Sequence, residues 1–494
     1  MDFVNHTPFP AQAFEGIDQY RRPFHVVVLR QTLSFAAGML EYADVQAPLC
    51  EGDVCFGELS GASVRQESDL CHYKPKCDVI VNATAYAPPG KPRTCFPVRL
   101  RVAKPDTPAP LPQRPQGLNQ FENAAPEIMA RWRKAVQHAE QHPVPGALLI
   151  NKTLIVNGPR QFKKKAGITL GLHGMLRLST LGMLRFNPWK LTDAKQVLTL
   201  PLRYEHAYGG ECRIGAGDPA AHHLPHKQRI ALAARTAQPA HDNAPVRPAA
   251  LHSVFEPNPR GTGYVEPLYL RATRTRTIAA PQIEQFGTPL CARQFWQALR
   301  GRLKDAAQGK PSAFQPAGFG IRAGSHPIRR ALAGTVDQTF INGDDALPTD
   351  FDFAFWNAAP PDQQTDFLHG NETLELINLC AADTPGATPD RDGNTTLRLK
   401  LPGHECFVLG RQKSGTLFRQ ALALDTVLLE PEERTLTLVW RGILPKDADA
   451  PLRCCEARMH GHEERDLAQR EVDFLDRSTG AAESTQSRTA EAPP

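Results

Sequence analysis

Hydrophobic and polar residues alternate along much of the chain, and this pattern predicts β-strands. In the run FPVRLRVA, Val98, Leu100 and Val102 alternate with Arg99 and Arg101. A period of two is typical of a half-buried strand, here with a solvated basic face. Apolar and alternating runs predict further strands at 24–35, 78–86, 147–158, 197–204, 373–378, 396–401 and 435–442.

Two segments have the apolar spacing of amphipathic helices. The first spans residues 122–142 and carries Pro126, which suits a first helical turn. The second spans residues 290–309, where Phe295 and Leu299 share one stripe. The remaining periodic segments are too short for long helices.

The order of these elements predicts the fold class. Short strands separated by turn residues, without regular alternation with helices, favour packed sheets over a doubly wound parallel sheet. We therefore predict a mainly β fold, with sandwich-like antiparallel sheets, two or three helices and long irregular loops. The expected domains are an N-terminal β-rich lobe (1–310) with an inserted proline-rich connector and helix (104–146), a C-terminal β-rich lobe (311–455), and a polar helical or disordered tail (456–494).

Composition narrows the classes of function. The 494 residues include 57 basic and 52 acidic ones, a balance that does not suggest nucleic acid or a membrane surface as an obligatory partner. No apolar run approaches the roughly 18 residues of a transmembrane helix. The N-terminus lacks the pattern of a secretory signal, and the eleven cysteines are irregularly spaced. These features predict a cytoplasmic protein with free thiols.

Histidines and cysteines cluster at three places, but without the spacing of a zinc site. The clusters are His222, His223 and His226; His404 and Cys406; and Cys454, Cys455, His460 and His462. Zinc sites usually contain short paired spacings such as C-x-x-C, and none occurs in this sequence. We expect no metal and no cofactor, with a metal-dependent effector built on these clusters as an alternative.

The segment PDRDGNTT has the start of a calcium loop. Asp390 and Asp392 precede a glycine, but the carboxylate that closes such a loop is replaced by Leu401. An Asp-Gly pair between two alternating runs is typical of a β-hairpin. We therefore predict a hairpin here and no calcium site.

The segment PLRYEHAYGGE (201–211) gathers polar and aromatic residues beside two glycines. Glu205 and His206 could act as acid and base, but neighbours in a strand point to opposite faces. A strand through the segment instead lets Arg203 and Glu205 pair on one face, and the glycines end it by adopting positive φ. Neither G-x-S-x-G nor H-E-x-x-H occurs, so we expect no catalytic residues.

Several segments, taken in order, resemble the domain of unknown function 2169 family over residues 5–445. They include SDLCHYKPKCDVIVNATAYAPPGKP (68–92), PLRYEHAYGGE, NPRGTGY (258–264), LPTDFDFAFWNAAPPDQQ (347–364) and LDTVLLEPEERTLTLVWRG (424–442). The resemblance implies a cytosolic adaptor or chaperone that helps load a type VI secretion effector onto the VgrG spike, with or without a PAAR tip. It brings no catalytic residues. Residues 104–146 look like an insertion, and the last 40 or so residues match no family segment.

An adaptor needs an exposed binding surface more than a catalytic cleft. Exposed β edges bind partners by strand addition, and aromatic side chains supply the anchoring contacts. We expect the effector or the spike component to contact Arg203, Glu205, Tyr208, Phe353 and Trp356.

Two alternatives stay open. The dense aromatic group at 351–356 can instead be buried core, as aromatic runs usually are. The protein can also be a hydrolase of cell-wall or carbohydrate material, with Glu205, His206, Asp350 and Asp352 as its acid-base groups.

Overall fold

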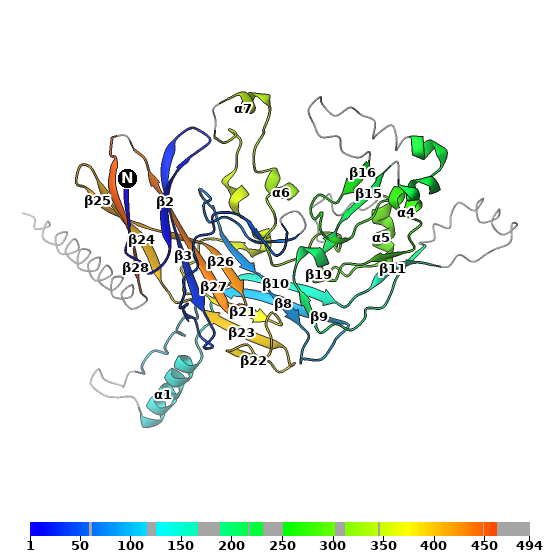
Figure 1. The fold of residues 1–494 in the computed structure, drawn as a ribbon. Coiled ribbons are helices and arrows are strands. Elements are labelled where there is room, and N and C mark those ends of the chain that lie inside the picture. Colours follow the sequence, from blue (N-terminus) through cyan, green and yellow to red (C-terminus); the bar gives the residue numbers. More distant parts are fainter. Residues whose placement is uncertain are drawn as a thin grey trace, which may run out of the picture.

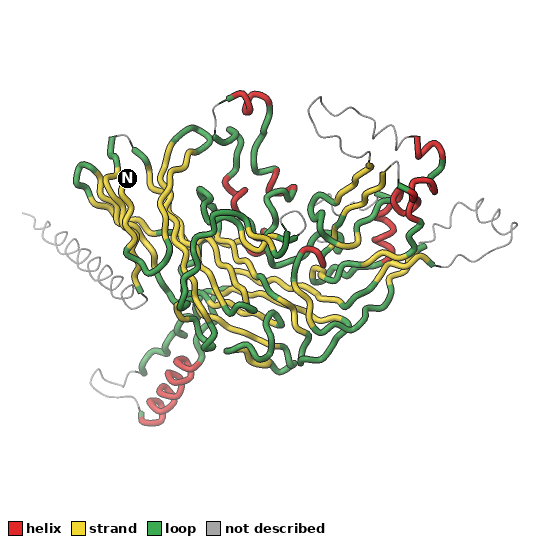
Figure 2. Tube along the Cα trace, viewed as in Figure 1, coloured by secondary structure: helices red, strands yellow, loops and turns green. Residues whose placement is uncertain are grey.

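Strands dominate the structure and form several sheets of mainly antiparallel strands (Figure 2). Three neighbouring pairs are parallel, β1 with β28, β7 with β26 and β14 with β17. The computed structural model describes residues 1–58, 62–115, 125–165, 188–215, 218–230, 250–301, 312–343, 346–447 and 449–461. The mainly β, sandwich-like architecture predicted from the alternating pattern is confirmed.

Two large sheets enclose the main core. The seven-stranded sheet contains β2 (Ala11–Ile17), β3 (Pro23–Ser34), β27 (Thr435–Pro445), β26 (Ala423–Glu430), β7 (Cys77–Val81) and β20 (Gln364–Thr365) in this order, with β4 (Glu41–Tyr42) pairing β3. The six-stranded sheet contains β19 (Ile283–Gln285), β10 (Leu148–Asn157), β9 (Cys95–Ala103), β21 (Thr373–Ile377), β23 (Thr395–Lys400) and β22 (Ala387–Pro389).

The core is formed by the inward rows of these two sheets. Leu29, Leu438, Leu100 and Leu376 have no exposed surface and belong to one contiguous apolar cluster. On the outer face of the six-stranded sheet, Glu375 lies between two arginines of neighbouring strands, which confirms the solvated basic face expected for β9. Alternation along each strand thus separates core from solvent, as a period of two requires.

Smaller sheets flank this sandwich (Figure 1). A four-stranded sheet contains β1 (Asp2–Asn5), β28 (Leu452–His460), β24 (Glu405–Gln412) and β25 (Leu417–Ala421), and a three-stranded sheet contains β12 (Trp189–Leu191), β11 (Gln161–Lys164) and β18 (Thr277–Ala279). Two-stranded sheets pair β13 (Thr199–Pro201) with β8 (Thr84–Tyr86), β14 (Tyr208–Gly209) with β17 (Thr262–Gly263), β15 (Glu211–Gly215) with β16 (Ala250–Val254), and β5 (Val54–Cys55) with β6 (Val64–Gln66).

The helices are short and lie outside the sheets. The α-helices include α1 (Pro126–Gln141), α4 (Pro267–Thr273), α5 (Ala292–Leu299), α6 (Pro327–Arg330) and α7 (Gln338–Asn342), and residues 226–230 are also helical. The 3₁₀ turns η1 (Tyr204–His206), η2 (Pro219–His223), η4 (Phe353–Trp356) and η5 (Pro361–Gln363) lie in the connections. Helix α5 packs into a second apolar core, in which Phe295 stacks on Phe162 at 3.8 Å. The helix expected at 290–309 is shorter at its described end, because α5 ends at Leu299 and residues 300–301 form a turn; residues 302–309 lie outside the described residues. No helix of the described ranges is both long and apolar enough to span a bilayer.

The sheets do not divide at residue 310, where the sequence suggested a boundary between two lobes. Strand β3 pairs with β27 along its length, and β9 pairs with β21, so both large sheets combine strands from either side of that position. The C-terminal tail also begins later than expected. Strand β28 continues to His460 between β1 and β24, and residues 462–494 lie outside the described residues.

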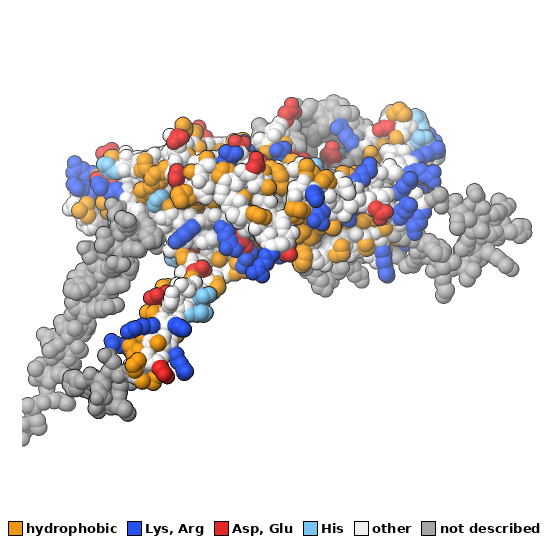
Figure 3. All heavy atoms as spheres, turned by 90° about the horizontal axis from the view of Figure 1, so that it is seen from below, with side chains coloured by type: hydrophobic (Ala, Val, Ile, Leu, Met, Phe, Trp, Pro, Cys, Tyr) orange, Lys and Arg blue, Asp and Glu red, His pale blue; other side chains and the backbone are white. Residues whose placement is uncertain are grey.

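The insertion at 104–146 leaves from one strand and returns to its neighbour. Ala103 at the end of β9 is paired with Leu148 at the start of β10, so the intervening segment is a long excursion from a hairpin. Helix α1 has no buried residue and projects from the body, with both basic and apolar side chains along it (Figure 3). Its predicted helical spacing is confirmed.

Candidate functional site

The segment 201–211 does not continue as a strand, because the backbone turns into the 3₁₀ helix η1 after β13. The carboxylate of Glu205 accepts hydrogen bonds from the backbone N–H of Ser63 at 2.7 Å and from its hydroxyl. The Arg203 guanidinium lies over the ring of Phe56, 4.2 Å from its centroid. The predicted pairing of Arg203 with Glu205 on a strand face is therefore wrong.

The two glycines of this segment adopt positive φ, as predicted, and allow a close approach of another loop. Gly209 has φ +154°, and a Cβ built there lies 2.1 Å from the carbonyl oxygen of Asn258. The Asn258 amide donates hydrogen bonds to the carbonyl oxygens of Tyr204 and Tyr208. The loop at 258–264 is thereby fixed against the 204–210 segment.

Replacing Gly209 with Ala is expected to lower the free energy of unfolding by about 2–3 kcal/mol, since both the backbone and Asn258 must shift. Denaturant unfolding measures this change. Gly415→Ala is the matched control, because Gly415 also has positive φ but no atom within 4 Å of a Cβ. An equal decrease in the free energy of unfolding in both variants would contradict the argument that Gly209 allows a close backbone approach.

A layer of buried ion pairs covers the second face of the seven-stranded sheet. Arg441 of β27 donates to the carboxylate of Asp425 on β26 at 2.6 Å. It also donates to the backbone carbonyls of Asp69 and Cys71, at 2.8 and 2.7 Å. The Asp69 carboxylate in turn binds Arg30 of β3 at 2.8 Å. These bonds fix the 69–71 segment on the sheet.

A second set of buried bonds fixes the neighbouring segment at 357–359. The carboxylate of Asp78 accepts bonds from the Lys74 amine at 3.0 Å, from the Asn357 amide and from the backbone N–H of Ala358. The Asn357 amide also donates to the carbonyl of Lys76. These bonds hold the backbone of the 357–359 segment in one position on the sheet.

Next to the segments held by these buried bonds lies a contiguous group of aromatic side chains, which we call the aromatic platform. His72 contacts the rings of Phe24 and Trp356, with centroids 5.8 and 6.2 Å apart, and Tyr73 contacts Phe353 at 5.9 Å. All its members are half-buried except Phe351, which is buried. The platform consists of Phe14, Phe24, His72, Tyr73, Phe351, Phe353, Phe355 and Trp356.

Within the described part of the protein, two polar atoms of the platform have no hydrogen-bond partner. They are the indole nitrogen of Trp356 and Nδ1 of His72, and both atoms are buried. Such groups are normally paired, because burying one without a partner costs free energy. The free protein therefore leaves these two polar atoms unpaired beneath the apolar surface of the platform.

Strand β2 supplies an open sheet edge beside the platform. The N–H of Arg30 donates to the carbonyl of Pro10, and the regular register of β2 with β3 makes the even-numbered residues of β2 the inward-bonded ones. The backbone groups of Ala11, Ala13 and Glu15 therefore point away from the sheet, and β2 is its last strand. Phe14, between them, belongs to the platform.

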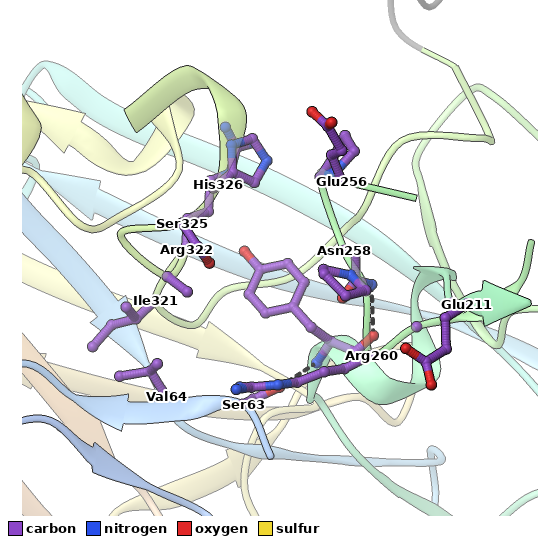
Figure 4. A pocket seen from close by; sticks show the side chains of 16 residues that line it. Ser63, Val64, Glu211, Glu256, Asn258, Arg260, Ile321, Arg322, Ser325 and His326 are labelled. Atoms are coloured by element: carbon purple, nitrogen blue, oxygen red, sulfur yellow. Dashed lines mark hydrogen bonds between the residues drawn. The ribbon is translucent and has the colours of Figure 1, made fainter. Parts of the chain in front are cut away.

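The largest cavity described, of about 610 Å³, lies elsewhere, at the meeting point of the 258–261 and 321–326 loops. Figure 4 shows Arg322, Ser325 and His326 on one side of it, facing Glu256 and Asn258. Burial and two nearby arginines, Arg322 and Arg329, lower the pKa of His326 to about 4, so its ring is neutral at physiological pH. Its Nδ1 accepts the backbone N–H of Ile328 at 3.3 Å.

Comparison with known proteins relates this architecture to a bacterial family. A family model described as an uncharacterized protein conserved in bacteria (DUF2169) matches residues 21–110 and 136–441. The chain belongs to the DUF2169 family. No curated protein and no solved structure matched it. The DUF2169 match omits residues 111–135, within the excursion that carries the start of α1, and ends at Arg441.

The five residues expected to contact a partner do not share one surface in this DUF2169 protein. Phe353 and Trp356 lie in the aromatic platform, whereas Arg203 and Glu205 are engaged with Phe56 and Ser63. Tyr208 is 5% exposed and packs into the second core. A partner reaches its ring only if that core opens. The platform residues from 14–24 and 72–73 carried no sequence signal of their own, because only the fold brings them together.

The four residues considered for hydrolysis have separate local contacts in the DUF2169 fold. Asp350 accepts the N–H and hydroxyl of Thr335, and Asp352 caps η4 through the N–H of Ala354. Glu205 binds Ser63, and none of the four, His206 included, lines the largest described cavity.

The histidine and cysteine clusters do not form a ligand set in the part of the sequence that is described. No group of three or more His, Cys, Asp or Glu side chains there is arranged to hold a metal ion. His404 is bonded to Gln31 at 2.6 Å, Cys406 is fully buried, and His462 lies outside the described residues. The hairpin predicted at 387–400 is confirmed by the pairing of β22 with β23.

Lys152 gives the protein a pH dependence of stability. Burial lowers the pKa of its amine to about 8, although Asp362, 2.9 Å away, opposes this shift. Between this value and the ordinary 10.5, the unfolded protein keeps the proton that the folded protein has lost. Raising the pH across this window therefore increases the free energy of unfolding.

The expected result is that Lys152→Met flattens this rise, because methionine cannot titrate. Urea unfolding at several pH values across the window measures the slope in each variant. Lys91→Met, at an exposed lysine, should leave the slope unchanged. A wild-type slope in the Lys152 variant would show that another group is responsible.

Proposed function

We propose that this protein is a non-enzymatic cytoplasmic adaptor that binds a type VI secretion effector and helps load it onto the VgrG/PAAR spike. The sequence resemblance suggests this role. The structural observation that carries it is the aromatic platform, held on a buried polar scaffold beside the open edge of β2.

The platform has the properties of a preorganised binding surface. Arg441 holds the carbonyl before His72, and Arg329 donates to the carbonyl of Phe355 at 2.9 Å. Rings held in this way lose little conformational entropy when a partner binds. Aromatic anchors of this kind contribute much of the affinity of protein interfaces.

The open edge of β2 suits an extended segment of the effector. Backbone groups of Ala11, Ala13 and Glu15 can bond to an added strand, while its apolar residues pack on Phe14 and its neighbours. In such an interface the backbone hydrogen bonds supply affinity, and the packing of side chains supplies selectivity. It also releases the effector without covalent chemistry.

Co-purification tests the proposal. The tagged protein is expressed with the effector and spike proteins encoded beside its gene, and each is tested for capture. We expect the effector to be retained, and its secretion to be lost in a strain that lacks this gene. Normal secretion in that strain, with no capture of any neighbouring product, would refute the adaptor role.

A further inference from the structure

Arg322 is a positively charged residue without an ion-pair partner in the described residues, although it lies at the wall of the cavity of about 610 Å³. No described ion pair includes it, and its buried Nε has no hydrogen-bond partner. It also acts on the partly buried Tyr204 phenol, on the Lys152 amine and on neutral His326. The Asp362 carboxylate acts on Tyr204 and Lys152 as well, but it is paired with Lys152 at 2.9 Å. Partly buried charged side chains are usually paired, because moving a charge out of water without a nearby opposite charge costs free energy.

The opposite wall of the cavity carries charges of both signs. Glu211, Glu256 and Arg260 line it, and the two glutamates face solvent as well. Glu211 has His252 at 2.9 Å, and Glu256 has Arg330 at 3.9 Å with both side chains about two-thirds exposed. Figure 4 shows Arg322 and Glu256 on opposite sides of the cavity.

This charge distribution selects among anionic ligands. A polyanion such as a nucleic acid, or a dianion such as phosphate, is attracted to Arg322 and Arg260 but repelled by the two glutamates that line the same cavity. A peptide carries one carboxylate at one place and amines, guanidinium groups or neutral amides at others, which matches both walls. A volume of about 610 Å³ is within the range of pockets that enclose such ligands.

The cavity walls are also rigid. The N–H of Arg322 donates to the carbonyl of Ala358, and its carbonyl accepts from Arg329. On the other side, Asn258 is fixed by its bonds to Tyr204 and Tyr208. A ligand therefore meets a formed site and does not have to order it.

We propose that this cavity binds a peptide segment of a partner protein through one carboxylate held by Arg322, with cationic or amide groups of the segment facing Glu211 and Glu256. That the peptide belongs to an effector rests on the adaptor function; that the cavity binds it does not. The carboxylate comes from an acidic residue of the segment or from the C-terminus of the partner.

The test uses the full-length protein and three short peptides that differ in one group. They are Ac-Lys-Ser-Ala-Glu-NH₂, its Gln analogue with an amidated end, and the same Gln analogue with a free C-terminal carboxylate; inorganic phosphate is the fourth probe. Binding is followed by the NMR signals of ¹³C-labelled histidine rings. His326→Asn, which preserves a helix-capping group, assigns the His326 signal.

We expect at least one carboxylate peptide to shift the His326 signal and to raise the pKa of His326 from about 4, because the bound carboxylate offsets Arg322. Arg322→Gln should weaken that binding about tenfold or more, and Arg322→Lys less. Arg398→Gln, the same charge change on the outer face of the six-stranded sheet, should bind like wild type. The peptide that binds distinguishes an acidic residue from a C-terminus as the source of the carboxylate.

Three results would overturn the proposal: equal binding of the amidated Gln peptide, unchanged binding by a folded Arg322→Gln variant, or tighter binding of phosphate than of any peptide. Arg322→Gln is expected to keep or raise the melting temperature, since it removes an uncompensated charge. A merely structural Arg322 would lower it instead. Failure of effector capture with intact peptide binding would count against the adaptor function alone.

Discussion

Replacing Arg441 with Met is expected to lower the free energy of unfolding by about 3–5 kcal/mol. Arg441 is 4% exposed and donates to the carboxylate of Asp425 and to the carbonyls of Asp69 and Cys71. Methionine fills similar space but leaves a buried carboxylate and two backbone oxygens without their donor. Urea unfolding of the two proteins measures the difference.

Arg398→Met is the matched control, because its partner Glu375 is also held by Arg101 and the Arg398 side chain is 71% exposed. Exposed pairs of this kind contribute about 0–1 kcal/mol. Adding Asp425→Leu to Arg441→Met should recover part of the loss, since the buried carboxylate is then absent. Similar small effects for Arg441 and Arg398 would mean that the ionic layer does not hold the fold together.

Replacing Trp356 with Ala is expected to weaken effector binding about 30-fold or more, equivalent to about 2 kcal/mol. The indole contacts Phe351, Phe355 and His72, so its loss opens the centre of the platform and removes the unpaired Nε1 donor. Calorimetric titration of the purified effector measures the affinity. Circular dichroism establishes that the variant stays folded.

Trp132→Ala is a suitable control for this measurement. Trp132 lies on α1, where its indole donates to the carbonyl of Pro112, outside the matched family segments. We expect it to leave effector affinity unchanged. If Trp132→Ala weakens binding and Trp356→Ala does not, the effector contacts the excursion at 104–146, and the platform has another role.

Elements that depend on local pattern were predictable from the sequence. Alternation in 96–103 indicated β9, the spacing in 122–142 indicated α1, and Asp-Gly at 392–393 indicated the hairpin before β23. In each, the residues that decide the structure are close in sequence. Strand 78–86 was predicted as continuous, but it breaks at Asn82 and Ala83, where the backbone leaves β7 and bonds to other segments.

The candidate sites depend on contacts between distant residues, which local patterns do not encode. Residues 201–206 have strand-like composition, yet Glu205 folds back to Ser63, which is remote in the sequence. The platform joins His72 to Trp356 only because Arg441 and Asp78 hold both segments on one sheet. Phe353 and Trp356 were identified as candidates only because aromatic residues are dense at 351–356. The platform residues at 14–24 and 72–73 were not identified.

The pairing of β3 with β27 has a consequence for synthesis. Strand β27, at residues 435–445, separates β3 from β26 and carries Arg441, so the sheet cannot close until almost the whole polypeptide has left the ribosome. Folding that must wait for such distant partners is slow. A polypeptide that ends before residue 435 lacks the arginine that positions His72 and Tyr73. If the proposed adaptor role holds, such incomplete copies lack the platform and do not compete with finished ones for the effector.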